Sequence, residues 1–356
     1  MNKAKMIQNL HELPSERVTK TILIASYLEP ELVERIRQVD SRLRVIYEPD
    51  LLGKPRYAAD HSAPHERTPE QEAQWRALLA QADILFDFDQ THRPDLPELA
   101  PHVGWVQSTS AGIGQFVKNM KYDQRMPNTI FTTASGIHAR PLAEFVVMAV
   151  LMHYKGALRM FRDQHRKHWE RYAGTDLEGR TLAIVGLGRV GSEIARLSRA
   201  LGMTVIGTDV KGSPEVVDRY YELGQLHAML PVADVLVLIV PHTPQTAKMI
   251  GAKELSLLPR GAFFINIARG AVLDEPALIE ALRSGYLSGA ALDVFTEEPL
   301  PPSSPLWEMP NVLVSPHSAS TSDRENARIT DLFCDNLRRF LNGEPLRNVL
   351  NTKLLY

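Results

Sequence analysis

Residues 181–209 read TLAIVGLGRVGSEIARLSRALGMTVIGTD, and this stretch decides the fold of the chain around it. Residues 181–185 form an apolar run typical of a buried parallel strand, and a glycine-rich turn follows directly. Apolar residues then recur at helical spacing from Val190 to Leu201, and Gly202 stands where a helix would stop. A second strand, residues 204–207, leads to Asp209. The pattern predicts a βαβ unit.

The glycines of this unit indicate dinucleotide binding. Gly186 permits a tight turn, Gly188 lets a pyrophosphate approach the backbone, and Gly191 lets the helix pack on the strand. The helix N-terminus would then bind phosphate. Asp209, 18 residues after Gly191, can accept hydrogen bonds from an adenosine ribose and would repel a 2′-phosphate, so NAD is favoured over NADP. Lys211 would soften that discrimination, and an ordinary βαβ crossover is the alternative interpretation.

Length and composition exclude several classes of protein. A chain of 356 residues is long enough for two domains. Forty basic and 42 acidic residues give a net charge of −2, which offers no electrostatic case for nucleic acid or an anionic membrane. No secretory leader or membrane-length apolar run is recognisable. The single cysteine, Cys334, fits a reducing compartment, so we expect a cytoplasmic protein without a metal site.

Strand-like and helix-like segments alternate along most of the chain, which predicts parallel α/β sheets. We expect two doubly wound domains: a Rossmann NAD-binding domain at residues 141–318, inserted into a discontinuous flavodoxin-like substrate domain at residues 21–140 and 319–356. Residues 1–20 would form a loose arm. One buried apolar helix is expected at residues 141–160, packed between the domains or against a second subunit. A last helix, residues 322–341, would return to the first domain.

Two loops of the early domain are candidates for substrate binding, because open α/β sheets bind ligands beyond the carboxyl ends of their strands. Residues 48–69 form a long polar loop that either touches substrate or is plain surface. Residues 108–114 are small and would expose backbone N–H groups where a helix begins. Ser110, Ala111 and Gly112 therefore form a reasonable cradle for a carboxylate, with a simple tight turn as the alternative.

Three polar residues follow strands of the nucleotide domain and should share one edge of its sheet. Arg269 offers a planar, permanently charged fork suited to a carboxylate. His317 can gain and lose a proton near neutrality, as proton transfer to a carbonyl oxygen requires. Glu298, if hydrogen-bonded to the imidazole, would orient the ring and stabilise its charged form. Each residue alone could equally be an ordinary surface or turn residue.

The motifs GLGRVG, NIARG, LDVFTEEP and SPHSA occur in this order at residues 186–191, 266–270, 292–299 and 315–319. Together they resemble the D-isomer-specific 2-hydroxyacid dehydrogenase family over residues 21–349. The resemblance implies an NAD(H)-dependent enzyme with a cleft between two α/β domains, usually a homodimer. PLPPSSPLW, at residues 299–307, is similar to glyoxylate or hydroxypyruvate reductase-like members. A phosphoglycerate dehydrogenase-like member is the alternative.

The resemblance also assigns roles to residues. It implies that Arg269, Glu298 and His317 are catalytic, and that Ser110, Ala111, Gly112 and Arg269 bind the substrate carboxylate. Beyond the three glycines, the cofactor contacts that it implies are Arg189, Val190, Asp209, Pro241, Thr246, Ile267, Arg269, Asp293 and His317.

We therefore expect hydride transfer from NADH to C2 of a 2-oxo acid, with His317 as proton donor, giving a D-2-hydroxy acid, or the reverse reaction. A formate or phosphite dehydrogenase of similar fold is one alternative, although such formate dehydrogenases carry glutamine where this chain has Glu298. A dinucleotide-sensing protein resembling co-repressors is another. Turnover of 2-oxo acids separates these hypotheses.

Overall fold

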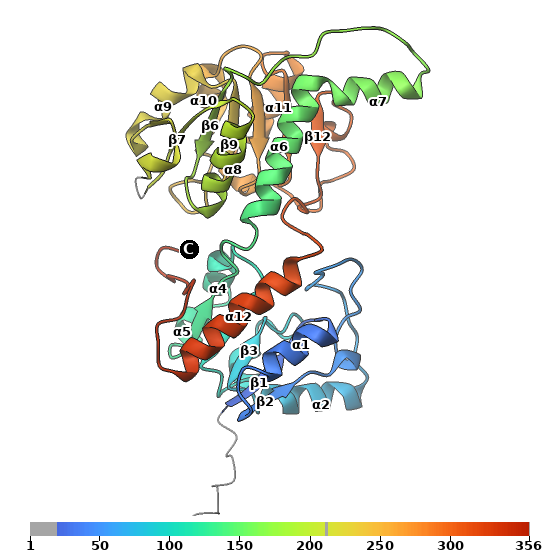
Figure 1. Ribbon diagram of the computed structural model, residues 1–356. Coiled ribbons are helices and arrows are strands. Elements are labelled where there is room, and N and C mark those ends of the chain that lie inside the picture. The colour runs from blue at the N-terminus through green and yellow to red at the C-terminus, as the bar shows by residue number, and fades with distance from the viewer. Residues whose placement is uncertain (1–19, 211–212, 356) are drawn as a thin grey trace, which may run out of the picture. The chain divides into compact units, whose positions relative to one another are not determined.

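The computed structural model describes residues 20–210 and 213–355, which form two compact units (Figure 1). The first unit contains the chain up to Ser135 and again from Ser322, and the second unit is Gly136–Thr321. These divisions lie a few residues from the predicted boundaries after residues 140 and 318. The predicted arm at residues 1–20 and Lys211 lie outside the described residues, except that Lys20 begins the first strand.

The first unit is built on a parallel sheet of five strands in the order β2-β1-β3-β4-β5. This is the flavodoxin-like order, in which the chain changes direction between β1 and β3. Its strands are β1 Lys20–Ile24, β2 Leu43–Ile46, β3 Ile84–Phe86, β4 Trp105–Gln107 and β5 Ile130–Thr132. Its helices are α1 Pro30–Arg37, α2 Pro69–Leu79, α3 Leu96–Leu99, α4 Gly114–Asn119, α5 Tyr122–Arg125 and α12 Glu325–Leu341.

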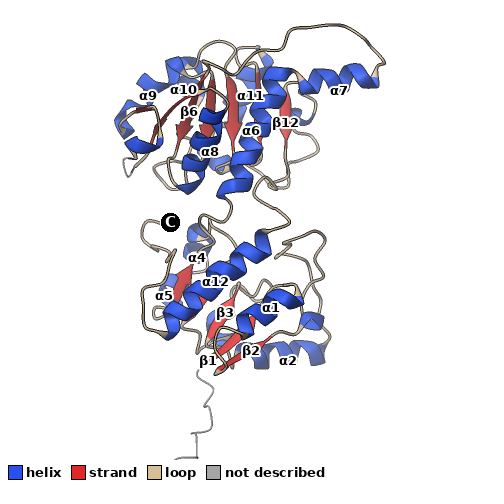
Figure 2. Ribbon diagram, viewed as in Figure 1, coloured by secondary structure: helices blue, strands red, loops and turns tan. Residues whose placement is uncertain are grey.

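Helices cover both faces of this sheet, as Figure 2 shows. Helices α1 and α12 lie against each other on one face, where Phe333 of α12 packs on Phe86 and Trp105 with ring centroids 5.1 and 4.9 Å away. The other face is buried under α2, α4 and α5, with Trp75 and Tyr122 fully covered. The alternating apolar strand residues thus supply two cores, one for each face.

A buried polar network crosses the core beneath α12. Thr132 Oγ1 accepts a hydrogen bond from Trp105 Nε1 at 2.8 Å and donates one to Gln107 Oε1 at 2.8 Å. Asn336 of α12 donates to the same Gln107 oxygen at 3.2 Å and accepts from the Arg347 N–H at 2.8 Å. Because buried polar groups are costly unless paired, these bonds fix the position of α12 over the centre of the sheet.

The second unit has a seven-stranded parallel sheet in the order β12-β11-β10-β9-β6-β7-β8. The chain changes direction between β6 and β9, as in a Rossmann fold, and the predicted fold class is confirmed for both sheets. Its strands are β6 Thr181–Val185, β7 Thr204–Thr208, β8 Arg219–Tyr220, β9 Val235–Leu238, β10 Phe263–Asn266, β11 Gly289–Leu292 and β12 Val312–Val314. Its helices are α6 Ala139–Lys155, α7 Ala157–His165, α8 Arg189–Ala200, α9 Leu226–Met229, α10 Ala252–Leu257 and α11 Glu275–Arg283.

Two predicted helices differ from the structure. The expected helix at residues 141–160 is instead two helices, α6 and α7, which meet at Gly156 at an angle of 62°. Gly156 adopts a left-handed backbone (φ 72°), a conformation that ends a helix and that glycine adopts without strain. Helix α6 packs against α8 within the second unit. The last helix begins at Glu325 rather than at residue 322.

Candidate functional site

Three of the sequence-predicted polar residues lie beyond the carboxyl ends of neighbouring strands in the second unit. Arg269 follows β10, Glu298 follows β11 and His317 follows β12, and these three strands are adjacent in the sheet. Because parallel strands end on the same side, the three residues belong to one edge. Because the sequence predicts a catalytic role for all three, we call this edge, with Arg269, Glu298 and His317, the catalytic edge.

The structure joins two of these residues directly. His317 Nδ1 lies 2.7 Å from Glu298 Oε2, and the side chains are 42% and 36% exposed. The other Glu298 oxygen accepts a hydrogen bond from the Phe295 N–H at 2.9 Å. His317 itself has a left-handed backbone (φ 54°), which is uncommon for residues other than glycine. The carboxylate is therefore anchored on one side and orients the imidazole on the other, leaving Nε2 as the ring nitrogen for a ligand.

Arg269 is positioned by its own turn rather than by the histidine–glutamate pair. Its Nη1 donates to the Ala268 carbonyl at 2.7 Å, while fully buried Asn266 accepts from the Ala268 N–H at 3.0 Å and donates to the Arg269 carbonyl at 3.3 Å. Burial lowers the pKa of the guanidinium, and the charges of Glu298 and Asp293 oppose that shift. Asn266 lies inside the NIARG motif, but no pattern in the sequence indicated that it holds this turn.

Asp293 holds the segment that carries His317. Its Oδ1 accepts hydrogen bonds from Ser315 Oγ at 2.5 Å, from the Ser318 N–H at 2.8 Å and from the Ala319 N–H at 3.0 Å. Burial raises the pKa of this carboxyl, and the hydrogen bonds favour its ionised form. The family resemblance implies a cofactor contact for Asp293. In the structure, Asp293 also holds the residues on both sides of His317 through these hydrogen bonds.

The glycine-rich turn has the geometry that its motif predicts. Gly186 adopts a φ of 109°, and a Cβ on Gly191 would lie 2.1 Å from the Gly186 carbonyl oxygen, so that only glycine lets α8 approach the strand. Gly188, by contrast, is exposed and caps α8, and a Cβ there would meet nothing within 4 Å. Because Gly188 has no side chain, the space in front of the helix N-terminus is open and can accommodate a pyrophosphate.

The remaining predicted cofactor residues also follow strands of the second unit. Asp209 comes directly after β7 with a half-buried side chain, and its carbonyl accepts a hydrogen bond from Tyr220 at 2.9 Å. Thr246 Oγ1 donates to the Pro241 carbonyl at 2.6 Å, which closes the loop after β9. At the start of α8, Arg189 is exposed and Val190 is half-buried, whereas Ile267 is buried beside β10.

The predicted carboxylate cradle lies after β4 in the first unit, and its three residues are exposed. The Ser110 N–H already donates to Ser108 Oγ at 3.0 Å, and the Ser110 carbonyl accepts from the Ala134 N–H at 3.1 Å. The amides of Ala111 and Gly112 bond to no other described residue. The cradle therefore has two available N–H groups rather than three, with the Ser110 hydroxyl beside them.

The long loop at residues 48–69 is ordered by its own contacts. Arg56 bonds to buried Asp60 through Nε at 2.7 Å and Nη2 at 3.0 Å, while Tyr57 is exposed. His61 Nδ1 lies 3.1 Å from Ser26 Oγ, just beyond β1. Across the described residues, no cluster of three metal-ligating side chains occurs. No single described helix is long and apolar enough to cross a membrane; α6 and α7 pass only as a bent pair, by length and composition.

A Rossmann-type sheet with a glycine-rich turn and a polar catalytic edge defines a dinucleotide-binding α/β protein, and comparisons with known proteins agree. Residues 147–319 match the family model of the D-isomer specific 2-hydroxyacid dehydrogenase NAD-binding domain. The glyoxylate reductase of Korarchaeum cryptofilum is 36% identical over 234 residues, which cover 63% of this chain and 70% of that protein.

Two solved structures resemble the whole chain. A D-isomer specific 2-hydroxyacid dehydrogenase family protein from Aeromonas salmonicida aligns with a TM-score of 0.78 at 28% identity, covering 94% of this chain and 99% of that one. The enzyme of the same description from Xanthobacter autotrophicus, solved with NADPH and MES, has a TM-score of 0.75 at 28% identity and covers 95% and 99%. The chain belongs to the D-isomer-specific 2-hydroxyacid dehydrogenase family.

Proposed function

We propose that the protein reduces a 2-oxo acid to a D-2-hydroxy acid with NADH, or catalyses the reverse reaction. The observation that carries this proposal is the 2.7 Å contact between His317 and Glu298 on the edge that also holds Arg269. An imidazole oriented by a carboxylate beside a fixed guanidinium is suited to protonate a carbonyl oxygen next to a carboxylate.

His317 acts in this proposal as the general acid. Glu298 accepts the hydrogen bond from Nδ1 and orients the ring, so that Nε2 is the nitrogen that passes its proton to the carbonyl oxygen. Asp293 keeps the surrounding segment in place through three hydrogen bonds. A bound NADH would supply the hydride that is added to C2. The reverse reaction uses the same imidazole as general base.

The substrate carboxylate is assigned to Arg269 together with the Ala111 and Gly112 amides and the Ser110 hydroxyl. Arg269 also polarises the carbonyl group that accepts the hydride. Its turn is fixed by Asn266, which limits the motion of the guanidinium before substrate binds. Prior orientation of this kind lowers the entropic cost of aligning the reacting groups.

The second unit is proposed to bind the cofactor, and the first unit to bind the substrate. Gly188 leaves open space for the pyrophosphate at the start of α8, while Gly186 and Gly191 allow the close packing of the turn. Asp209, directly after β7, is proposed to accept hydrogen bonds from the ribose hydroxyls. We propose NAD rather than NADP because a carboxylate at this position repels a 2′-phosphate. The comparison of catalytic efficiency with NADH and NADPH tests this choice, and an Asp209→Ser variant should shift the ratio toward NADPH.

Glyoxylate and hydroxypyruvate are the proposed substrates. The 36% identical relative is named a glyoxylate reductase, and the sequence at residues 299–307 is similar to that group. The test is the rate of NADH oxidation with these two acids, with 3-phosphohydroxypyruvate and with branched and aromatic 2-oxo acids. NADH binding without turnover of any of them would favour a dinucleotide sensor, and turnover of formate or phosphite would favour the other alternative.

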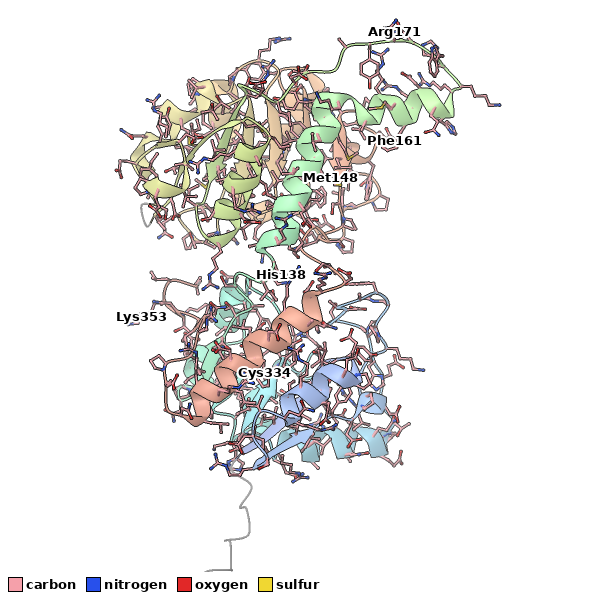
Figure 3. All side chains as sticks on the ribbon, in the orientation of Figure 1. His138, Met148, Phe161, Arg171, Cys334 and Lys353 are labelled. Atoms are coloured by element: carbon pink, nitrogen blue, oxygen red, sulfur yellow. The ribbon has the colours of Figure 1, made fainter. Side chains whose placement is uncertain are left out.

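We also propose that the protein is a homodimer in a reducing compartment such as the cytoplasm. Helix α7 has no buried residue, and Phe161 on α7 and Met148 on α6 are exposed on the second unit, as Figure 3 shows. Trp169 in the following segment is 94% exposed. Apolar side chains left open in this way are typical of a protein interface. The molar mass in solution tests the dimer, and a Phe161→Asp/Trp169→Asp double variant should be monomeric.

A further inference from the structure

A second polar cluster lies at the carboxyl edge of the first unit's sheet, and none of its residues belongs to the four family motifs. It contains Ser26 after β1, Asp87 after β3, Thr109 after β4 and His61 from the loop at residues 48–69. We call these four residues the Asp87 cluster. They surround the point between β1 and β3 at which the chain changes direction in the sheet, where open α/β sheets commonly bind ligands.

Asp87 is the centre of this cluster and has two unusual properties. Its side chain is 2% exposed, and its backbone is left-handed (φ 68°). The carboxylate accepts a hydrogen bond from Thr109 Oγ1 at 3.0 Å and a longer one from the Thr109 N–H at 3.5 Å. Burial raises the pKa of Asp87, and the charge of His61 opposes that shift. Burial of a carboxylate lowers the stability of the fold unless hydrogen bonds compensate for the loss of water.

Thr109 connects Asp87 to the proposed carboxylate cradle. It directly precedes Ser110, whose N–H is held by Ser108 Oγ and whose carbonyl is held by the Ala134 N–H. The chain is thus fixed up to Ser110 and then exposed at Ala111 and Gly112. The direction in which these two amides point depends on the geometry of the residues just before them.

His61 brings the long loop to the same place. Its Nδ1 lies 3.1 Å from Ser26 Oγ, and its Nε2 is buried without a hydrogen-bond partner among the described residues. The loop at residues 48–69 and the cradle loop are therefore both anchored at the Asp87 cluster.

We infer that Asp87 is a positioning residue for substrate binding: through Thr109 it sets the direction of the Ala111 and Gly112 amides that receive the substrate carboxylate. This inference rests on the proposed function. Asp87 does not touch the substrate in this account. Its removal should therefore weaken substrate binding and leave cofactor binding unchanged.

Two pairs of variants distinguish the effect of losing the hydrogen bond from the effect of changing the backbone conformation. Glycine adopts a positive φ without strain, so Asp87→Gly removes the carboxylate but keeps the left-handed conformation, while Asp87→Asn keeps both that conformation and an acceptor. Thr109→Val removes the hydroxyl at nearly constant shape, and Thr109→Ser keeps it. Thr129→Val is the control, because it removes a hydroxyl that bonds to the Val103 carbonyl at 2.6 Å before β5, at the opposite edge of the sheet.

Steady-state kinetics with glyoxylate should show a rise in KM of about tenfold for Asp87→Gly and Thr109→Val, as expected for one hydrogen bond to a charged group. The Kd for NADH should stay unchanged, and Asp87→Asn, Thr109→Ser and Thr129→Val should keep a KM near that of the wild type. A purely structural role would instead lower the active fraction, and therefore the apparent kcat, at constant KM. A wild-type KM for Asp87→Gly, or equal effects of Val and Ser at position 109, would overturn the inference.

Amide hydrogen exchange of peptides covering residues 108–116 gives a readout that needs no turnover. Exchange should be faster in Asp87→Gly and Thr109→Val and unchanged in the other three variants. If the wild type reduces no 2-oxo acid, the proposed function fails, and the exchange rates still decide whether Asp87 positions the loop. Unchanged exchange in an active enzyme would reject the positioning role alone.

Discussion

The carboxyl edges of the two sheets are built from similar residues but use them in opposite ways. On the second unit, His317 and Glu298 are bonded to each other and remain more than one third exposed. On the first unit, Asp87 is almost completely buried, and its carboxylate accepts hydrogen bonds from Thr109 of a neighbouring loop. The first arrangement presents titratable atoms to a ligand, whereas the second holds backbone in place.

An acid and a histidine on a sheet edge therefore do not by themselves identify a catalytic group. Exposure and the identity of the bonded partner decide between chemistry and positioning. Variants that change one edge or its supporting core test this distinction.

The largest effect is expected from His317→Ala. Loss of the general acid should lower kcat for 2-oxo acid reduction by about 1000-fold, with little change in the Kd for NADH. His227→Ala is the matched control, because His227 also lies 2.9 Å from a glutamate, Glu254, but on helices away from the catalytic edge. Comparable losses in both variants, or a normal kcat in His317→Ala, would remove the distinction between the two edges.

Asn336→Ala tests the buried network that supports the first unit. The change leaves Gln107 and the Arg347 amide with fewer partners, and should lower the free energy of unfolding by about 2 to 3 kcal/mol. Chemical denaturation measures this loss, and Asn342→Ala, at the exposed end of α12, should change little. A lower kcat in the folded Asn336→Ala enzyme would mean that the first unit's core also affects the chemical step. That result would contradict the distinction between the two edges.

Gly188→Ala places a methyl group in the open space before α8. Because a Cβ there meets no protein atom, the fold should be retained, while the Kd for NADH should rise by about tenfold or more. Fluorescence titration with NADH measures the change. Gly224→Ala is the control, since a Cβ at Gly224 also meets nothing within 4 Å and lies outside the glycine-rich turn. An unchanged Kd would argue against pyrophosphate binding at Gly188.

A loss of stability that depends on pH is expected from His153, a histidine of the second unit that lies away from the catalytic edge. Burial lowers its pKa to about 4, and it bonds to Ser288 Oγ at 2.9 Å. The unfolded chain takes up this proton near pH 6.5, so the folded state should lose stability as the pH falls from about 6.5 to 4, by at most about 1.4 kcal/mol per pH unit, and no further below 4. His153→Gln should flatten this part of the curve, and parallel curves would contradict the assignment.

The sequence predicted what its local patterns encode. The glycine-rich turn, the βαβ unit and the catalytic-edge residues each lie within a short continuous motif. The sequence therefore predicted correctly where they occur relative to the strands of the second unit. The break at Gly156 was missed because apolar residues continue through it. Asp87, Thr109 and His61 come from three separate segments, and only the sheet order brings them together. Their roles, like those of the predicted site residues, now await the measurements above.

The discontinuity of the first unit has a consequence for synthesis on the ribosome. Residues up to Ser135 form the whole sheet of that unit, but α12, which covers one face of it, follows only after residues 136–321. At translation rates of roughly 5 to 20 residues per second, α12 is synthesised on the order of ten seconds or longer after the sheet whose apolar face it covers. The inserted unit has time to fold first, and during that interval the nascent chain offers a hydrophobic sheet surface that a chaperone could shield.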